Sequence, residues 1–75
     1  MEQVRRLTAV IEQDNDAYVA LCPEFDIASQ GSTVEEARAN LIEALTLFFE
    51  TAGEDEVQRR GRSRVFVTQV EVSVG

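Results

Sequence analysis

The chain has 75 residues and a mass of 8.4 kDa, which is the size of one small domain with a thin hydrophobic core. Domains this small usually need a disulfide, a metal or a partner subunit for stability. A single cysteine excludes an intrachain disulfide, and the lack of histidine removes the usual zinc ligands and a histidine general base. Association with another chain is the remaining route to stability.

Acidic residues outnumber arginines by 14 to 7, so the net charge is −7 and the pI is about 4.4. Such a chain is a poor binder of nucleic acid and suits a basic partner. The net negative charge lies entirely in residues 1–53, because acidic residues and arginines balance after Gly53. No stretch approaches the ~20 apolar residues that span a bilayer, and the apolar stretch that ends at Glu12 is too short for a secretory signal. We therefore expect a soluble cytoplasmic protein.

The first half of the chain predicts a β-hairpin. Residues 7–13 contain β-branched residues, and the Asp14-Asn15-Asp16 sequence favours a tight turn. The apolar run 17–22 predicts a strand that is central in a sheet or covered on both faces, and Pro23 ends it. Residues 27–30 form either a short third strand or an extended loop.

Residues 33–52 predict the longest element, an amphipathic helix. Thr33 and Glu36 have the spacing of a capping box, and Gly53 is the expected C-terminal stop. One helix face carries the apolar residues Val34, Ala37, Leu41, Ala44, Leu45, Phe48 and Ala52.

A second apolar set on this helix comprises Ile42, Leu47 and Phe49, with Glu43 and Glu50 beside them. Adjacent helical residues point about 100° apart, so Phe48 and Phe49 cannot both be central to one stripe. The second set is either the flank of a wide core face or an exposed apolar strip with an acidic rim that meets another protein.

After the helix we expect a linker over residues 54–64, with a possible helical turn around Val57, and then a final strand over 64–74. One face of that strand carries Phe66, Thr68, Val70, Val72 and Val74. The order β-β-β-α-β predicts an α+β fold of two layers, in which one long helix packs on a face of a mixed sheet. The last strand would lie parallel to the first through a right-handed crossover.

Few residues suggest chemistry, and each has a structural alternative. Cys22 is a buried apolar residue or a reactive thiol. The pairs Asp14/Asp16 and Glu24/Asp26 are turn residues or magnesium ligands, and the cluster Arg59–Arg64 is a solvated loop or a nucleic-acid contact. We expect the structural alternative each time, with no catalytic residue, no metal and no cofactor.

Several short motifs, in this order and spacing, resemble the HicB-like antitoxin family. They are Tyr18 with Ala20, Cys22-Pro23-Glu24-Phe25, Gln30-Gly31-Ser32-Thr33, Glu35-Glu36-Ala37, Asn40-Leu41 and Glu43-Ala44. The resemblance spans about residues 7–50. It implies a partial ribonuclease H-like fold with strand order 3-2-1-4 and a non-catalytic protein that covers the active site of a small basic RNA-cleaving toxin, HicA.

The resemblance and the charge pattern together predict a single HicB-like domain over residues 1–75, without the C-terminal DNA-binding module that many relatives carry. The expected toxin-binding residues are Glu24, Asp26, Ile42, Glu43, Phe49 and Glu50. The alternative is a homo-oligomeric binding or scaffold domain without a toxin, a dimer or tetramer whose interface is the final strand with Val70, Val72 and Val74.

Overall fold

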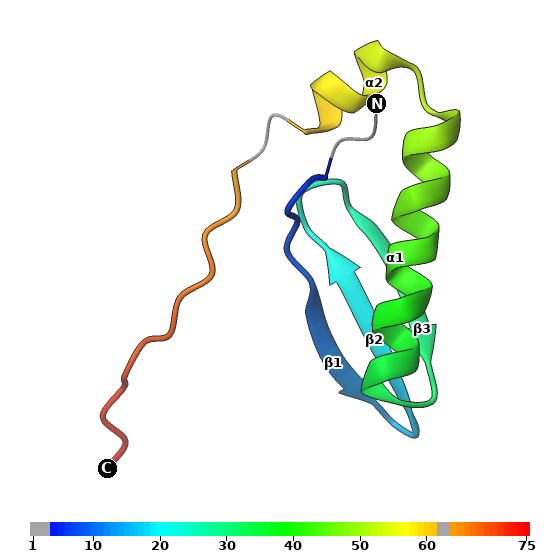
Figure 1. The fold of residues 1–75 in the computed structure, drawn as a ribbon. Coiled ribbons are helices and arrows are strands. Elements are labelled where there is room, and N and C mark those ends of the chain that lie inside the picture. The colour runs from blue at the N-terminus through cyan, green and yellow to red at the C-terminus, as the bar shows by residue number, and fades with distance from the viewer. Residues whose placement is uncertain (1–3, 62–63) are drawn as a thin grey trace.

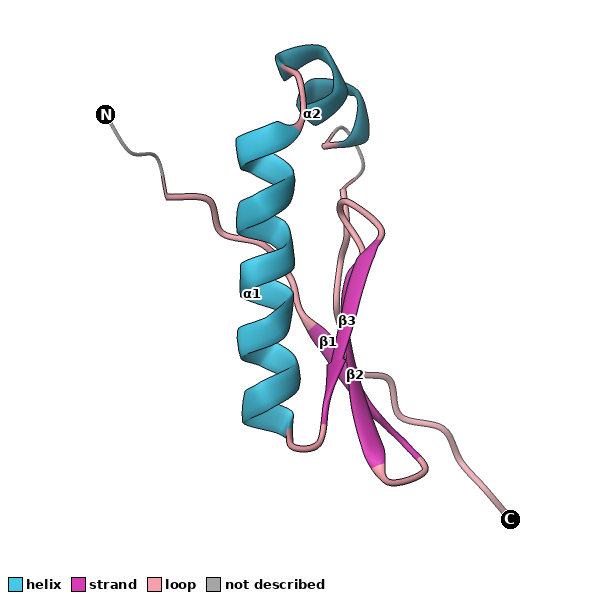
Figure 2. Cartoon of the chain, turned by 90° about the vertical axis from the view of Figure 1, so that its right-hand side faces the viewer, coloured by secondary structure: helices cyan, strands magenta, loops and turns pink. Residues whose placement is uncertain are grey.

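The computed structural model describes residues 4–61 and 64–75, and it has two layers (Figure 1). Three strands, β1 (Val10–Asp14), β2 (Ala17–Cys22) and β3 (Ile27–Gly31), form an antiparallel sheet in the order β1-β2-β3. The helix α1 (Val34–Thr51) covers one face of this sheet, and the shorter helix α2 (Glu54–Arg60) follows it (Figure 2). The α+β class and the β-β-β-α order are confirmed.

The two hairpin turns have the backbone that their sequences predict. Asp14 pairs with Ala17 across the first turn, where Asn15 has a φ of 57°. Cys22 pairs with Ile27 across the second turn, where Asp26 has a φ of 55°. Asparagine and aspartate tolerate this left-handed conformation better than most residues. The third segment is therefore a paired strand rather than an extended loop.

The connection between β3 and α1 is tight. A Cβ on Gly31 would lie 2.5 Å from the backbone nitrogen of Ala37, so only glycine fits there. Thr33 caps the helix, since its hydroxyl accepts a hydrogen bond from the Glu36 N–H at 3.0 Å. The Glu36 carboxylate accepts from the N–H and hydroxyl of Ser32, both at 3.1 Å, rather than from the cap residue itself.

The core lies between α1 and the sheet. Within residues 4–61 and 64–75, the buried hydrophobic residues of this core are Ala20, Cys22, Phe25, Ala37, Leu41 and Leu45. Partly buried hydrophobic residues surround it, among them Ile11, Tyr18 and Phe48. Val34, which we expected on the apolar face, is instead exposed on the first helical turn. The opposite face of the sheet has no covering helix in the described part of the chain (Figure 2).

The helical turn expected around Val57 is the helix α2, and it packs over the second hairpin turn. The Arg60 guanidinium donates a hydrogen bond to the Phe25 carbonyl and lies 4.9 Å from the centre of the Phe48 ring. Gly53 does not act as a left-handed stop, because α1 ends with Ala52 as its cap and Gly53 caps α2. Among the described residues, neither helix has the length and apolar character needed to cross a bilayer.

The prediction of a final strand over residues 64–74 is wrong in one respect. Residues 64–75 are extended, yet they form no strand and join no sheet in the described structure, so the expected mixed sheet with order 3-2-1-4 is a three-stranded antiparallel sheet. The segment projects away from the rest of the chain (Figure 1). Alternating valines specify an extended backbone, but a strand also requires a neighbour to accept its hydrogen bonds.

The Gly31 contact predicts a matched pair of variants. Gly31→Ala forces the β3–α1 connection apart, and we expect it to lower the free energy of unfolding by about 1–3 kcal/mol. Gly53→Ala meets no atom within 4 Å and should change the stability by less than about 0.5 kcal/mol. Urea unfolding followed by circular dichroism at one protein concentration measures both. Equal effects of the two substitutions would contradict the packing described here.

Candidate functional site

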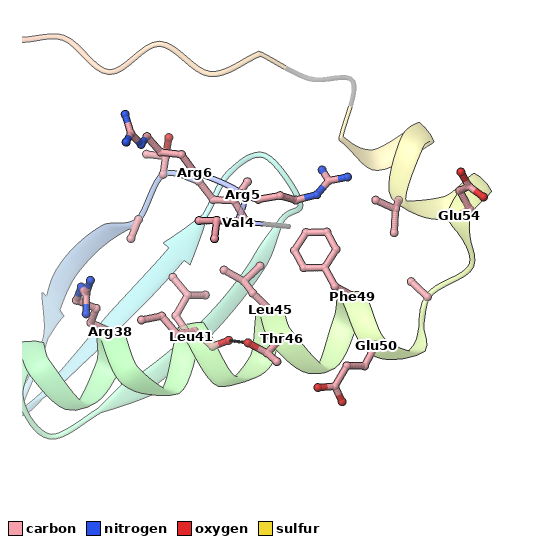
Figure 3. Close-up of a pocket in the computed structure, with 16 residues that line it drawn as sticks. Val4, Arg5, Arg6, Arg38, Leu41, Leu45, Thr46, Phe49, Glu50 and Glu54 are labelled. Carbon is pink, nitrogen blue, oxygen red and sulfur yellow. Dashed lines mark hydrogen bonds between the residues drawn. The ribbon is translucent and has the colours of Figure 1, made fainter. Parts of the chain in front are cut away.

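A groove lies between the N-terminal segment 4–9 and one flank of α1 (Figure 3). Its volume is about 970 Å³. Apolar side chains form its floor, among them Leu41, Ile42, Leu45 and Phe49. Because α1 packs on β2 and β3, its flank above β1 remains open. The groove is the consequence of this one-sided packing.

An aromatic cluster closes one end of the groove. The rings of Phe25, Phe48 and Phe49 lie 5.0–5.4 Å apart, in tilted and edge-to-face arrangements. The Arg5 guanidinium lies 5.1 Å from the centre of the Phe49 ring. This cation–π contact holds the N-terminal segment beside α1 and covers one face of Phe49.

Charges of both signs flank the groove. Arg5, Arg6 and Arg38 lie along the N-terminal segment and the first half of α1, whereas Glu50 and Glu54 lie near the end of α1 (Figure 3). The expected acidic rim is therefore present on one side only. A ligand that fills the groove would meet arginines on the N-terminal segment and at Arg38, and carboxylates near the end of α1.

The structure brings three of the six expected toxin-binding residues together. Ile42, Phe49 and Glu50 line the groove, and Glu43 lies beside Leu47 and Glu50 in a shallow depression on the outer face of α1. The side chain of Ile42 is 48% exposed and that of Leu47 is 59% exposed. Phe49 thus flanks the core, whereas Ile42 and Leu47 are exposed about 140° apart around α1, with Glu43 and Glu50 between them. We call this outer surface of Ile42, Glu43, Leu47 and Glu50 the exposed strip.

Glu24 and Asp26 lie elsewhere, in the turn between β2 and β3. The Glu24 carboxylate accepts hydrogen bonds from the Thr8 hydroxyl at 2.7 Å and from the Thr8 N–H at 3.0 and 3.2 Å. Burial acts to raise the pKa of Glu24. The hydrogen bonds from Thr8, from the Glu24 backbone N–H and from the Cys22 thiol outweigh burial and hold the pKa below its ordinary value. Glu24 therefore ties the N-terminal segment to the turn, while Asp26 remains exposed.

Cys22 is fully buried, as expected of a small apolar residue. Its Sγ lies 3.4 Å from the Glu24 Oε1 atom. Burial, and then the hydrogen bond and charge of Glu24, raise the pKa of this thiol. The arrangement keeps the thiol protonated and stabilises the turn.

The remaining charged groups do not converge. Within residues 4–61 and 64–75, no three cysteine or acidic side chains form a group that could hold a metal ion. The expected arginine cluster is divided, because Arg60 turns inward to Phe25 and Glu56 whereas Arg59 and Arg64 are exposed. Arg62 lies outside the described residues. The predicted interface valines Val70, Val72 and Val74 are exposed on the unpaired C-terminal segment.

Sequence reasoning missed the arginine side of the groove. Arg5 and Arg6 are far from α1 in the sequence, and only the hairpin brings the N-terminal segment next to Phe49. The one available signal was the apolar residue Leu7 directly after two arginines at the start of a predicted strand. That pattern does not reveal which helix the arginines meet.

Two curated relatives are similar to the chain. A UPF0150 protein of Thermotoga maritima is 41% identical over 59 residues, which cover 73% of this chain and 79% of the relative. The UPF0150 protein ssl0738 of Synechocystis is 47% identical over 51 residues, which cover 65% of this chain and 71% of the relative. The chain belongs to the UPF0150 family.

No family model and no solved structure matches this UPF0150 protein. Membership of the UPF0150 family specifies no activity, so the function is argued from the groove, the exposed strip on α1 and the charges around them.

The Glu24–Thr8 contact predicts a pH-dependent stability. Because the pKa of Glu24 is lower in the folded than in the unfolded chain, its carboxylate stabilises the fold above about pH 4.3, the ordinary glutamate pKa. This contribution is lost as the pH falls through the folded-state pKa. Glu24→Gln should therefore lower the unfolding temperature at about pH 7, and the difference from the natural chain should shrink towards about pH 3.

The matched control is Glu43→Gln, which neutralises an exposed carboxylate on α1. Thermal unfolding of the three proteins across this pH range measures the effect. If Glu24→Gln behaved like Glu43→Gln at every pH, the hydrogen bonds to Thr8 would contribute nothing to stability.

Proposed function

We propose that this UPF0150 protein is a HicB-like antitoxin domain, which binds a small basic RNA-cleaving toxin of the HicA type and masks its active site without catalysis. The observation that carries the proposal is the exposed strip of α1, where Ile42 and Leu47 leave apolar surface in water on either side of Glu43 and Glu50. The HicB-like motifs over residues 7–50 supply the class of partner.

The exposed apolar residues of this strip favour a protein as the partner. A surface helix of a stable monomer normally turns polar residues outward, whereas Ile42 and Leu47 leave about half of their side chains in water. Burial of apolar surface provides the main driving force of association, at about 25 cal/mol per Å². A partner that covers this strip removes it from water without any change in the core.

The charge supports a basic partner. Glu43 and Glu50 are exposed between Ile42 and Leu47, and the net charge of the whole chain is −7. Opposite charges accelerate the encounter of two proteins and fix their orientation, while the apolar residues of the exposed strip slow dissociation of the complex. An RNA-cleaving enzyme needs positive charge where it binds phosphates, so an acidic protein that covers this surface competes directly with RNA.

The extended C-terminal segment favours a second candidate, a homo-oligomeric binding domain without a toxin. Its valines are exposed although their alternation suits a buried strand face. The two candidates use different surfaces, because the exposed strip lies on α1 and the valines lie beyond α2.

The toxin proposal is tested by co-expression of the chain with a small basic protein encoded beside it. We expect the two proteins to co-purify and the complex to cleave RNA more slowly than the basic protein alone. The double variant Glu43→Lys/Glu50→Lys should lower the association rate at low salt by at least about tenfold.

The matched control is Asp14→Lys/Asp16→Lys, which makes the same charge change at the tip of the first hairpin. This control should alter the association rate by less than about threefold. The proposal is wrong if RNA cleavage proceeds unchanged in the presence of the chain, or if both double variants reduce association equally.

A further inference from the structure

The geometry points to a strand exchange between two copies of this chain, in which residues 64–74 of each copy add to the free edge of β1 in the other and run antiparallel to it. This inference goes beyond the proposed function, since it names a surface that the chain presents to itself whether or not a toxin is bound. Four observations carry it: an unpaired arm, a free strand edge, an open groove beside that edge, and the charges along both segments.

The arm, residues 64–74, is an extended segment that pairs with no strand of the described residues. The side chains of Val70 and Val72 are 79% and 75% exposed. The Cα radius of gyration of the chain is 14.6 Å, whereas a compact chain of this length has about 11 Å. Unpaired backbone groups on an extended apolar segment are a template for pairing with another strand.

The sheet offers a place for this arm at β1. The strand order β1-β2-β3 leaves β1 with one unpaired edge, and the segment 4–9 continues β1 along the groove. Residues 4–13 match the length of residues 64–73. A strand added at this edge directs alternate side chains into the groove, against Ile42 and Leu45.

The charges favour the antiparallel direction, which a second copy supplies. In Figure 1 the arm and β1 both run away from α2, so an arm placed on its own β1 edge would run parallel to it. A parallel arm would set Arg64 near Arg5 and Arg6, with like charges side by side. An antiparallel arm instead brings Glu71 to these arginines, and antiparallel pairing is slightly more stable per residue.

One register of the arm against β1 and segment 4–9 gives suitable side-chain pairs on both faces of the sheet. It places Phe66 opposite Ile11 and Val70 opposite Leu7 on the groove side, where Ile11 and Leu7 already flank the core. On the other side it places Val67 opposite Val10 and Glu71 opposite Arg6. A shift by one residue would turn Val70 away from the groove. Because each copy gives and receives one arm, the assembly closes as a two-fold dimer.

The register is tested by cross-linking. In the variant Val10→Cys/Val67→Cys, the two cysteines face each other between copies, and both positions are exposed in a single chain. Under mild oxidation with oxidised glutathione, we expect a disulfide-linked dimer on a non-reducing gel. The control Val10→Cys/Thr68→Cys moves one cysteine to the opposite face and should give little cross-linked dimer.

The second test measures association of the otherwise natural chain by sedimentation. Val70→Lys places a charge in the groove and should raise the dimer dissociation constant at least about tenfold. Gln69→Lys adds the same charge on the open face and should raise it less than about threefold. Because Val70 is exposed in the single chain, the substitution leaves the fold of that chain intact, which circular dichroism checks.

Three results would overturn the exchange. A chain that sediments at 8.4 kDa throughout the micromolar range has no partner for its arm. A dimer that gives no preferential cross-link at positions 10 and 67 uses a different surface. Equal effects of Val70→Lys and Gln69→Lys would place the arm outside the groove. All these measurements use the chain alone, so their failure leaves the toxin proposal standing, and failure of toxin binding leaves the exchange standing.

Discussion

The structure depends on the burial of one face of a three-stranded sheet under a single helix. Of the residues that the structure describes, only six hydrophobic ones are buried in this contact, so little apolar surface leaves water when the chain folds alone. Apolar residues therefore remain in water around this contact. They lie in the groove beside β1, in the exposed strip on α1 and in the arm after α2. Each of these surfaces is one that another chain can cover.

The motifs that resemble HicB-like domains have structural roles in this chain. Gly31 allows β3 to approach α1, Thr33 caps the helix, and the Asn40 amide donates a hydrogen bond of 2.8 Å to the Gln30 carbonyl. Together they hold the first turns of α1 against the end of β3. Because α1 packs mainly on β3 and β2, its flank above β1 stays open, and Gly31, Thr33 and Asn40 do not line that flank.

The sequence predicted the elements whose signals are local. Turn residues next to paired strands located the hairpin, and a capping residue before an apolar stripe located α1 within one or two residues of its ends. The final strand was not predictable in the same way, because its alternating valines are compatible with any partner edge. The role of Glu24 was also hidden, since its partner Thr8 is brought close only when the N-terminal segment passes the second turn. Long-range proximity of this kind created the groove as well.

The central claim is that this chain completes the burial of its apolar surface with another protein chain. Thermal unfolding of the purified chain at protein concentrations between about 1 and about 100 µM tests it most directly, because association with a second copy makes the midpoint depend on concentration. The account predicts a midpoint that rises by several degrees over this range. A midpoint that stays constant, in a chain that also gains no stability from a basic protein added at the same concentrations, would contradict it.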